Sequence, residues 1–390
     1  MRTVLLCGLS LLSISTTLLY LQRAPFPTSF HPALSEHLSH HWQTLTQPIQ
    51  FSWPLYSSSS AYPGATECPW DPFSAPGMIH WGSAPNDTRW VPFPQDLEAY
   101  KPDPRLARLD KLDSEWKGLT EREMEALGAG ERLMLDMGTG GAEWATGRNV
   151  LLLGDSHDRN NVFNFCKEMK GKHTSWGGHT GGWCRVERLN FTIAYWFLYG
   201  ITDSDYAWFA DREKPPKTPE SRFSEVFLPR MVADGMADWQ PDMIMANSLF
   251  WDTDHLFDQY FAEFGIKRRS QEGLSFQEVR YHQQRVVALL RLLRAQFGPL
   301  VPMMYRSRHL RSSNDRGLML RIAQLDQGWR AVGEAMGVRV FDWGSRLEGF
   351  TDFYDGKQHF PPGPVTWLFG DMLLHYLREA MDPERWWACL

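Results

Sequence analysis

Short apolar segments that alternate with longer helical patterns constrain the fold of this chain more than any other feature. Residues 149–153, Asn-Val-Leu-Leu-Leu, end in Gly154 and are typical of a strand buried in a parallel sheet. The further strand candidates are residues 186–195, 243–246, 300–305 and 338–341. Long helical patterns separate the later ones, most clearly over 275–296 and 364–380. This alternation predicts an α/β fold with a mostly parallel sheet covered on both faces, and function at the carboxyl ends of the strands.

The composition excludes some classes of protein and partner. Of the 390 residues, 43% are hydrophobic and 22% are charged, so the chain can bury a sizeable core. Its net charge of -6 offers no basic stripe for phosphates, so nucleic acid is not an expected partner. The 18 Trp residues are a high number. Aromatic faces often line carbohydrate sites, but a Trp-rich core is the plainer interpretation, because aromatic residues dominate core burial.

The first 23 residues predict a membrane segment. Residues 4–21 are apolar apart from small polar residues, follow Arg2 and end before Gln22-Arg23. Eighteen residues is the lower limit for a helix that spans a bilayer, and no clear small-x-small cleavage site follows. We therefore expect an uncleaved signal anchor over 1–23, in a single-pass type II protein with a lumenal body. A cleaved secretory signal has the same layout and is the alternative; it would leave the protein secreted.

The rest of the chain divides into a stem and one folded domain. Residues 24–66 are rich in Pro, Ser, His and Thr and predict a flexible stem, and residues 67–390 are expected to form the domain. Two glycosylation sequons, at Asn86 and Asn190, support a lumenal location.

The cysteines suit an oxidising compartment. Outside the anchor there are four, which allow two disulfides in three connectivities, and we favour Cys166 with Cys184 and Cys68 with Cys389. The sequence contains no Cys-x-x-Cys and no metal or nucleotide motif, so neither a metal nor a cofactor is expected.

The strand candidate 149–153 leads into Gly154-Asp155-Ser156-His157, and a helix is expected over 158–169. A serine at such a turn exposes its hydroxyl at the sheet edge, where its own N–H and the helix N-terminus can stabilise an oxyanion. Serine is a weak nucleophile until a base removes its proton, so the base must come from elsewhere in the chain. The alternative is that Ser156 only caps the helix.

Gly154-Asp155-Ser156 resembles the first block of the SGNH, or GDSL-type, hydrolases. The longer string from Gly154 to Asn161, Gly-Asp-Ser-His-Asp-Arg-Asn-Asn, followed by Cys166, resembles the PC-esterase branch, which includes the plant trichome-birefringence-like polysaccharide O-acetyltransferases. The resemblance covers blocks between about 149 and 380. It implies a three-layer α/β/α, flavodoxin-like fold with a mostly parallel sheet of about five strands, and a Golgi protein with a short stem.

The resemblance also implies donors for an oxyanion, because SGNH enzymes use a Gly and an Asn in that role. Asn247, directly after the strand candidate 243–246, matches the Asn block. Its amide can donate without carrying a charge, although a turn-forming Asn is the alternative. For the Gly we choose Gly178 from a Gly-rich stretch before Cys184, which is otherwise a flexible loop. Arg159 is expected to face the site and hold an anionic or carbonyl oxygen; the alternative is a surface ion pair.

The base is predicted near the C-terminus. The family pattern is Asp-x-x-His just before the last helix, and His359 matches it by position, ahead of Pro361. The acid departs from the pattern, because Gly356 lies three residues before His359 and Asp355 four. We take Asp355 as the acid that orients the imidazole, with Asp352 as the fallback. The alternative for His359 is an exposed loop residue.

Together these residues predict a serine-dependent enzyme of the Golgi or ER membrane. The expected reaction transfers an acyl group, by the resemblance O-acetyl, to a glycan hydroxyl through an acyl-enzyme. The partners would be a glycan or polysaccharide acceptor, a small acyl donor and, through residues 1–23, the membrane. The alternatives are an esterase with the same triad and a catalytically inactive glycan-binding module.

Overall fold

The computed structural model describes residues 77–80, 88–92, 142–177, 179–202, 218–269, 271–309, 316–348 and 359–387. All lie in the second of the two units into which the chain divides, Ser57–Leu390. Within these ranges no helix has the length and apolar character needed to cross a membrane. Several predictions fall outside the described residues and stay predictions: the anchor 1–23, the stem 24–66, Asn86, Gly178, Asp352, Asp355, and the Cys68–Cys389 disulfide.

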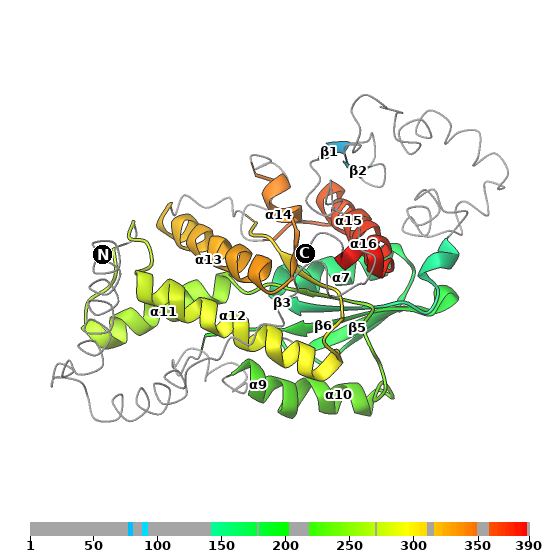
Figure 1. Ribbon diagram of the computed structural model, residues 1–390, viewed down its shortest axis with the longest axis horizontal. Coiled ribbons are helices and arrows are strands. Elements are labelled where there is room, and N and C mark those ends of the chain that lie inside the picture. The colour runs from blue at the N-terminus through cyan, green and yellow to red at the C-terminus, as the bar shows by residue number, and fades with distance from the viewer. Residues whose placement is uncertain are drawn as a thin grey trace, which may run out of the picture. The chain divides into compact units, whose positions relative to one another are not determined.

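A seven-stranded, mostly parallel sheet forms the centre of the domain (Figure 1). In spatial order its strands are β4 (Lys172–Ser175), β5 (Gly181–Val186), β6 (Phe191–Phe197), β3 (Asn149–Gly154), β7 (Met243–Ala246), β8 (Met303–Arg306) and β9 (Arg339–Phe341). The five strands from β6 to β9 pair in parallel, and β4 and β5 add an antiparallel edge. The α/β class is therefore confirmed, with two strands more than the five expected.

The prediction of one strand over residues 186–195 was wrong. The chain forms β5, then a short 3₁₀ helix, η4 (Glu187–Leu189), and then β6, which runs antiparallel to β5. Asn190 ends η4 in the left-handed conformation with φ 49°, a region that Asn tolerates better than most residues. The predicted strand thus begins five residues too early for β6, and β5 lies in the Gly-rich stretch that was expected to be a loop.

Part of the Gly-rich stretch is strand rather than loop, because Gly181 and Gly182 begin β5. A Cβ atom on Gly182 would lie 2.1 Å from the carbonyl oxygen of Thr174 on β4. Glycine therefore permits the close approach of β4 and β5 at this position.

Helices cover both faces of the sheet. On one face lie α7 (Ser156–Glu168), α15 (Pro364–Ala380) and α16 (Pro383–Trp387), and on the other lie α12 (Phe276–Phe297) and α13 (Arg316–Ala335). The central strand β3 serves both, because Val150 and Leu152 pack into the first core and Leu151 and Leu153 into the second. The three-layer arrangement implied by the resemblance is thus confirmed, and it explains why this strand is apolar at every position from Val150 to Leu153.

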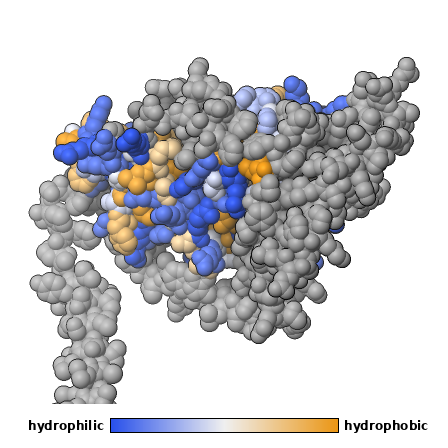
Figure 2. Space-filling model, turned by 90° about the horizontal axis from the view of Figure 1, so that it is seen from above, coloured by the Kyte–Doolittle hydropathy of each residue, from blue (hydrophilic) through white to orange (hydrophobic). Residues whose placement is uncertain are grey.

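The remaining elements lie around this frame. They are η3 (Ala142–Ala145), α9 (Pro219–Arg222), the π-helix η5 (Phe223–Phe227), α10 (Leu228–Ala233), α11 (Phe250–Phe264) and α14 (Trp343–Arg346). A separate antiparallel pair, β1 (Gly77–His80) with β2 (Arg89–Pro92), docks on α15 through Trp90, whose backbone N–H donates to Asp371 at 2.6 Å. On the face seen in Figure 2, hydrophilic and hydrophobic residues are interspersed over the coloured part of the surface, as on folded domains generally.

Local sequence signals place the main helices. At α12, Ser275 and Glu278 form a capping box. Because Ser275 is the cap, the helix begins and ends one residue later than the predicted 275–296. The helix α15 has the predicted bounds, with Pro364 in its first turn. The helix α7 begins at Ser156, two residues earlier than predicted, because Asp155 supplies its cap.

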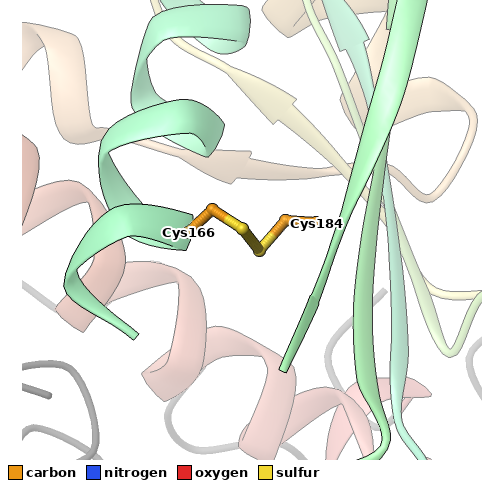
Figure 3. The surroundings of a disulfide bond; sticks show 2 residues. All are labelled: Cys166 and Cys184. Atoms are coloured by element: carbon orange, nitrogen blue, oxygen red, sulfur yellow. A yellow bond between two sulfur atoms is a disulfide. The ribbon is translucent and has the colours of Figure 1, made fainter. Parts of the chain in front are cut away.

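The predicted disulfide between Cys166 and Cys184 is present and joins α7 to β5 (Figure 3). The two residues are 18 positions apart in sequence. Gly171 lies beside the bridge, where a Cβ atom would be 3.0 Å from each sulfur. The helix that begins with Ser156 is therefore tied covalently to the sheet near its C-terminal end.

Candidate active site

Neighbouring parallel strands deliver polar residues to one edge of the sheet. The strand β3 ends at Gly154, and Ser156 follows as the first residue of α7. Asn247 comes directly after β7, and its backbone N–H donates to Leu153 of β3 at 2.8 Å. Arg306 is the last residue of β8, which pairs with β7. The carboxyl ends of three strands therefore meet here, as expected for a site in an open α/β sheet.

The side chains of Ser156 and His359 meet at this edge. The Nε2 atom of His359 lies 2.8 Å from the Oγ atom of Ser156, although the two residues are 203 positions apart in sequence. Both are partly exposed. His359 precedes α15, and α15 packs beside α7 on the same face of the sheet. The packing of these two helices brings the imidazole to the hydroxyl. This is the geometry in which an imidazole can remove the hydroxyl proton.

The N-terminus of α7 leaves one backbone donor for a ligand. The carboxylate of Asp155 caps the helix and accepts from the backbone of His157 at 2.8 Å and, in a capping box, from the backbone of Asp158. The N–H of Ser156 takes no part in this cap. Ser156 is thus the first helical residue rather than the cap, and its N–H and the helix dipole are placed to stabilise an anion at its hydroxyl.

Asp155 is ionised, and the residues around it hold it so. Burial favours the neutral carboxyl, but the hydrogen bond and charge of His157 and the charge of Arg306 keep the pKa of Asp155 well below its usual range. The Nδ1 atom of His157 lies 3.3 Å from the Asp155 carboxylate, and an Arg306 guanidinium nitrogen lies 3.6 Å from it. A fixed negative charge therefore lies beneath the histidines at the site.

A buried ion pair joins α7 to β8. Arg306 donates from Nε to Asp158 at 2.5 Å and from Nη2 to the other oxygen of the same carboxylate at 2.8 Å. The charges of Asp158 and Asp155 raise the pKa of Arg306 against the effect of burial. This pair was not predicted from the sequence. The signal was a run of polar residues at 306–309, directly after the apolar strand candidate 300–305 and therefore at the carboxyl edge of the sheet.

Asn247 is almost fully buried, at 2% exposure, with its amide against β8. Its Nδ2 donates to the carbonyl oxygen of Arg306 at 2.7 Å, which fixes which way the amide faces. An amide nitrogen has two N–H groups, so one remains for a ligand. This position is compatible with the predicted oxyanion role and leaves that role a prediction.

Arg159 lies on the first turn of α7, half-buried, at the same edge. Its Nε donates to the side-chain oxygen of Asn160 at 3.2 Å, and its guanidinium carbon is 5.7 Å from the ring centre of Phe197, the last residue of β6. The sequence left a site-facing role and a surface ion pair open. The position at the end of β6 suits the first of these, and the role in catalysis stays a prediction.

Three histidine rings lie together behind Ser156. The ring of His157 is centred 3.6 Å from that of His309 and 4.9 Å from that of His359. Asp155, His157 and His309 also form a group whose ligand atoms lie within 4.8 Å of one another, a spacing that suits a metal ion. However, the guanidinium of Arg306 lies among them, 3.0 Å from Nδ1 of His309. Because this cation lies 3.6 Å from the Asp155 carboxylate and would repel a metal ion among these ligands, we assign no metal to the group.

A second buried polar network supports the site from behind. Asp252 of α11 accepts hydrogen bonds from the backbone of Ile201 at 2.8 Å and of Thr202 at 2.9 Å, and from the hydroxyl of Ser248. His282 of α12 lies 3.4 Å from the same carboxylate. These contacts tie the chain after β6 to two helices. Although the network contains Ser, His and Asp, its serine donates to the carboxylate and not to the histidine, which is not the arrangement of a catalytic triad.

A cavity of about 550 Å³ opens at the opposite edge of the sheet. Its lining includes Arg148, Asp242 and Trp387, and the predicted site residues are not among the residues that line it. It lies beside the start of β3 rather than its end, and so apart from Ser156.

No protein-family model and no curated protein matches this chain. Among solved structures, it is similar to a GDSL-like lipase from Parabacteroides merdae, with 13% identity over 60% of this chain and 96% of that one and a TM-score of 0.35. The acetylxylan esterase Axe2 from Geobacillus stearothermophilus has 11% identity over 60% of this chain and 96% of that one, with a TM-score of 0.35. An α/β hydrolase, LAE5, from the metagenome of Lake Arreo in Spain has 14% identity over 61% of this chain and 98% of that one, with a TM-score of 0.29.

The chain has an SGNH-hydrolase-like fold. That statement rests on its own three layers, its mostly parallel sheet and the position of Ser156 between β3 and α7. What this fold does in the present chain is argued from the site alone, because a fold does not fix a function.

Proposed function

We propose that this chain cleaves acyl esters through a covalent acyl group on Ser156 and passes that group, by the sequence resemblance an acetyl group, to a hydroxyl of a glycan. The observation that carries the proposal is the 2.8 Å contact between the Ser156 hydroxyl and the His359 imidazole at the carboxyl edge of the sheet. A serine needs such a base to become a nucleophile, and a helix N-terminus beside it suits the anion that forms on attack.

In the first half of the reaction, the Oγ atom of Ser156 attacks the carbonyl carbon of the acyl donor while its proton passes to Nε2 of His359. The carbonyl oxygen becomes an oxyanion near the N–H of Ser156. The bond to the leaving alkoxide then breaks, and His359 returns the proton to that oxygen. The products are an alcohol and acyl-Ser156.

In the second half, an acceptor hydroxyl loses its proton to His359 and attacks the acyl carbon, and Ser156 takes the proton back as it leaves. Water as the acceptor gives an esterase, and a sugar hydroxyl gives a transferase. The Ser–His pair serves both, so acceptor binding and exclusion of water decide between them.

The glycan acceptor and the secretory pathway rest on features outside this pair. The Cys166–Cys184 disulfide is typical of a protein from an oxidising compartment. The predicted anchor and the two sequons support the same location, with membrane attachment through residues 1–23. The resemblance to polysaccharide O-acetyltransferases supports transfer over hydrolysis.

The proposal is tested with a serine-reactive fluorophosphonate probe and with p-nitrophenyl acetate. We expect the wild type to be labelled and to release nitrophenol, and Ser156→Ala to do neither. Ser224→Ala, at an exposed serine of η5, is the matched control and should behave as the wild type. Equal labelling of wild type and Ser156→Ala would contradict the proposal, and an unlabelled wild type would favour the inactive binding module.

Transfer and hydrolysis are then separated by the fate of the acetyl group. With p-nitrophenyl acetate as donor, free acetate and acetylated sugar are measured with and without added oligosaccharides. Acetylated sugar that appears only with active Ser156 supports the transferase. Free acetate alone, at a rate that oligosaccharides do not change, supports the esterase.

A further inference from the structure

Arg306 contacts both parts of the proposed catalytic apparatus, through its side chain and through its backbone. We infer that Arg306 is a positioning residue that fixes the nucleophile Ser156 and the oxyanion donor Asn247 relative to each other. The inference rests on the proposed function, since it assigns these two residues their roles in acyl transfer.

The side chain holds the nucleophile's helix. The two bonds to the Asp158 carboxylate, from Nε and Nη2, form a bidentate pair on the first turn of α7. The same carboxylate accepts from the backbone N–H of Asp155 at 3.1 Å, directly before Ser156. Through one carboxylate, the guanidinium therefore fixes the turn from which the catalytic hydroxyl projects.

The backbone of the same residue holds the amide. The carbonyl oxygen of Arg306 accepts from Nδ2 of Asn247 at 2.7 Å, one strand away. This bond selects the orientation in which the nitrogen, and not the oxygen, lies against β8. A shift of β8 at Arg306 would thus turn the Asn247 amide and move the α7 turn together.

The packing around the guanidinium leaves it one position. Arg306 has 0% exposure, its Nη1 lies 3.3 Å from the Ser307 carbonyl and 3.0 Å from His309 Nδ1, and its centre is 5.9 Å from the Trp343 ring. On the far side, a Cβ atom on Gly154 would lie 1.8 Å from the Asp158 carboxylate, so glycine provides the space that this carboxylate fills. Close packing therefore leaves neither the Arg306 guanidinium nor the Asp158 carboxylate space for a second conformation.

Lysine at position 306 cannot make the same contacts, because its ammonium group lacks the planar fork with which the guanidinium binds both oxygens of the Asp158 carboxylate. Misplacement of donor and nucleophile raises the barrier of the chemical step, whereas binding of the uncharged ester does not depend on the oxyanion geometry. The effect of a substitution should therefore fall on kcat and leave KM nearly unchanged. A residue needed only for stability would change neither in a protein that is still folded.

The test compares Arg306→Lys with Arg339→Lys in the full chain. Arg339 is a matched control, because it is also buried and starts the adjacent strand β9, where its Nε donates to the Trp386 carbonyl at 3.2 Å, at the edge away from Ser156. Hydrolysis of p-nitrophenyl acetate is measured well below the melting temperature of each variant, with folding checked by circular dichroism. We expect Arg306→Lys to lower kcat by at least ~100-fold with KM within about threefold, and Arg339→Lys to keep the wild-type kcat.

Folded Arg306→Lys with a wild-type kcat, or an equal loss of kcat in both variants, would overturn the inference. Should Arg306→Lys fail to fold, Asp158→Asn decides in its place. This change keeps the shape of the carboxyl and removes its charge, and a fall in kcat at constant KM supports the inference, while an unchanged kcat overturns it. A wild type that neither hydrolyses the ester nor reacts with the fluorophosphonate marks failure of the proposed function itself.

Discussion

The Nε2 atom of His359 and the Oγ atom of Ser156 are 2.8 Å apart; His359 lies five residues before α15, and Ser156 is the first residue of α7. We expect Ser156→Ala and His359→Ala each to lower kcat for ester cleavage by about 10³-fold or more, because the first removes the nucleophile and the second its base. Steady-state kinetics with p-nitrophenyl acetate measures the loss, and thermal melting checks that both variants fold. Activity in folded His359→Ala near that of the wild type would assign the base to another residue.

The acid of the triad departs from the family pattern, because Asp355 lies four residues before His359 instead of three. We expect Asp355→Ala to lower kcat by less than His359→Ala does, because the acid orients the imidazole and stabilises its cation without itself reacting. The same assay on Asp352→Ala provides the comparison. Wild-type rates in Asp355→Ala together with a loss in Asp352→Ala would show that Asp352 is the acid.

Asn247 is expected to act on the transition state. The variant Asn247→Ala removes an uncharged donor and should lower kcat by ~10²–10³-fold, with a small effect on KM. Asn164→Ala is the matched control, since Asn164 is also buried but lies two turns along α7. If both variants lose kcat equally, the effect comes from the fold and not from the oxyanion.

The Cys166–Cys184 disulfide should stabilise the domain more than it supports catalysis. A loop closed over 18 residues corresponds to about 3 kcal/mol of unfolding free energy in the chain-entropy account. We expect Cys166→Ser/Cys184→Ser to lose roughly that amount in urea denaturation, and to keep most of its kcat at temperatures where it is folded. A midpoint equal to that of the wild type would contradict this.

Buried His255 should make stability depend on pH in mildly acidic solution. Burial lowers the pKa of His255 below the value of 6.5 that applies to the unfolded chain, in spite of the nearby charge of Asp252. The unfolded chain therefore binds the proton first, so stability is complete above about pH 6.5 and is lost as the pH falls from there through the folded pKa. His173, whose pKa burial also lowers, adds a change of the same sign.

The measurement for His255 is urea unfolding at pH 7 and pH 5. We expect the wild type to lose unfolding free energy between the two, and His255→Gln, which can retain the bond to Thr202, to lose less. An equal loss in the two proteins would assign the pH dependence to other groups.

The parallel strands could be predicted from the sequence because they are buried on both faces of the sheet. The strand β3 is apolar at every position from Val150 to Leu153, and that pattern, followed by Gly154, located both the sheet and the edge at which Ser156 lies. The strand β5 was missed because it begins with Gly181 and Gly182, in the Gly-rich stretch that was expected to be a loop. The strand β4 was not predicted either, so both antiparallel edge strands are missing from the predicted count.

The site was predictable only where a residue has a signature of its own. Ser156 and His359 stand in short motifs beside a strand and a helix, and the structure brings them together as expected. Arg306 stands in no such motif, and its ion pair with Asp158, 148 positions away, is visible only once the chain has folded.

The helix α7 is fastened at both of its ends, by the ion pair with Arg306 at its first turn and by the disulfide from Cys166 to β5 further along. A nucleophile on a helix held at both ends cannot change its position to suit different acceptors. Any change of acceptor during evolution would therefore have to arise in the connecting segments that follow the strands, while the strand–helix platform under the serine stays as it is. Such segments can be lengthened or exchanged without disturbing the chemistry, which would let one scaffold serve different acceptors.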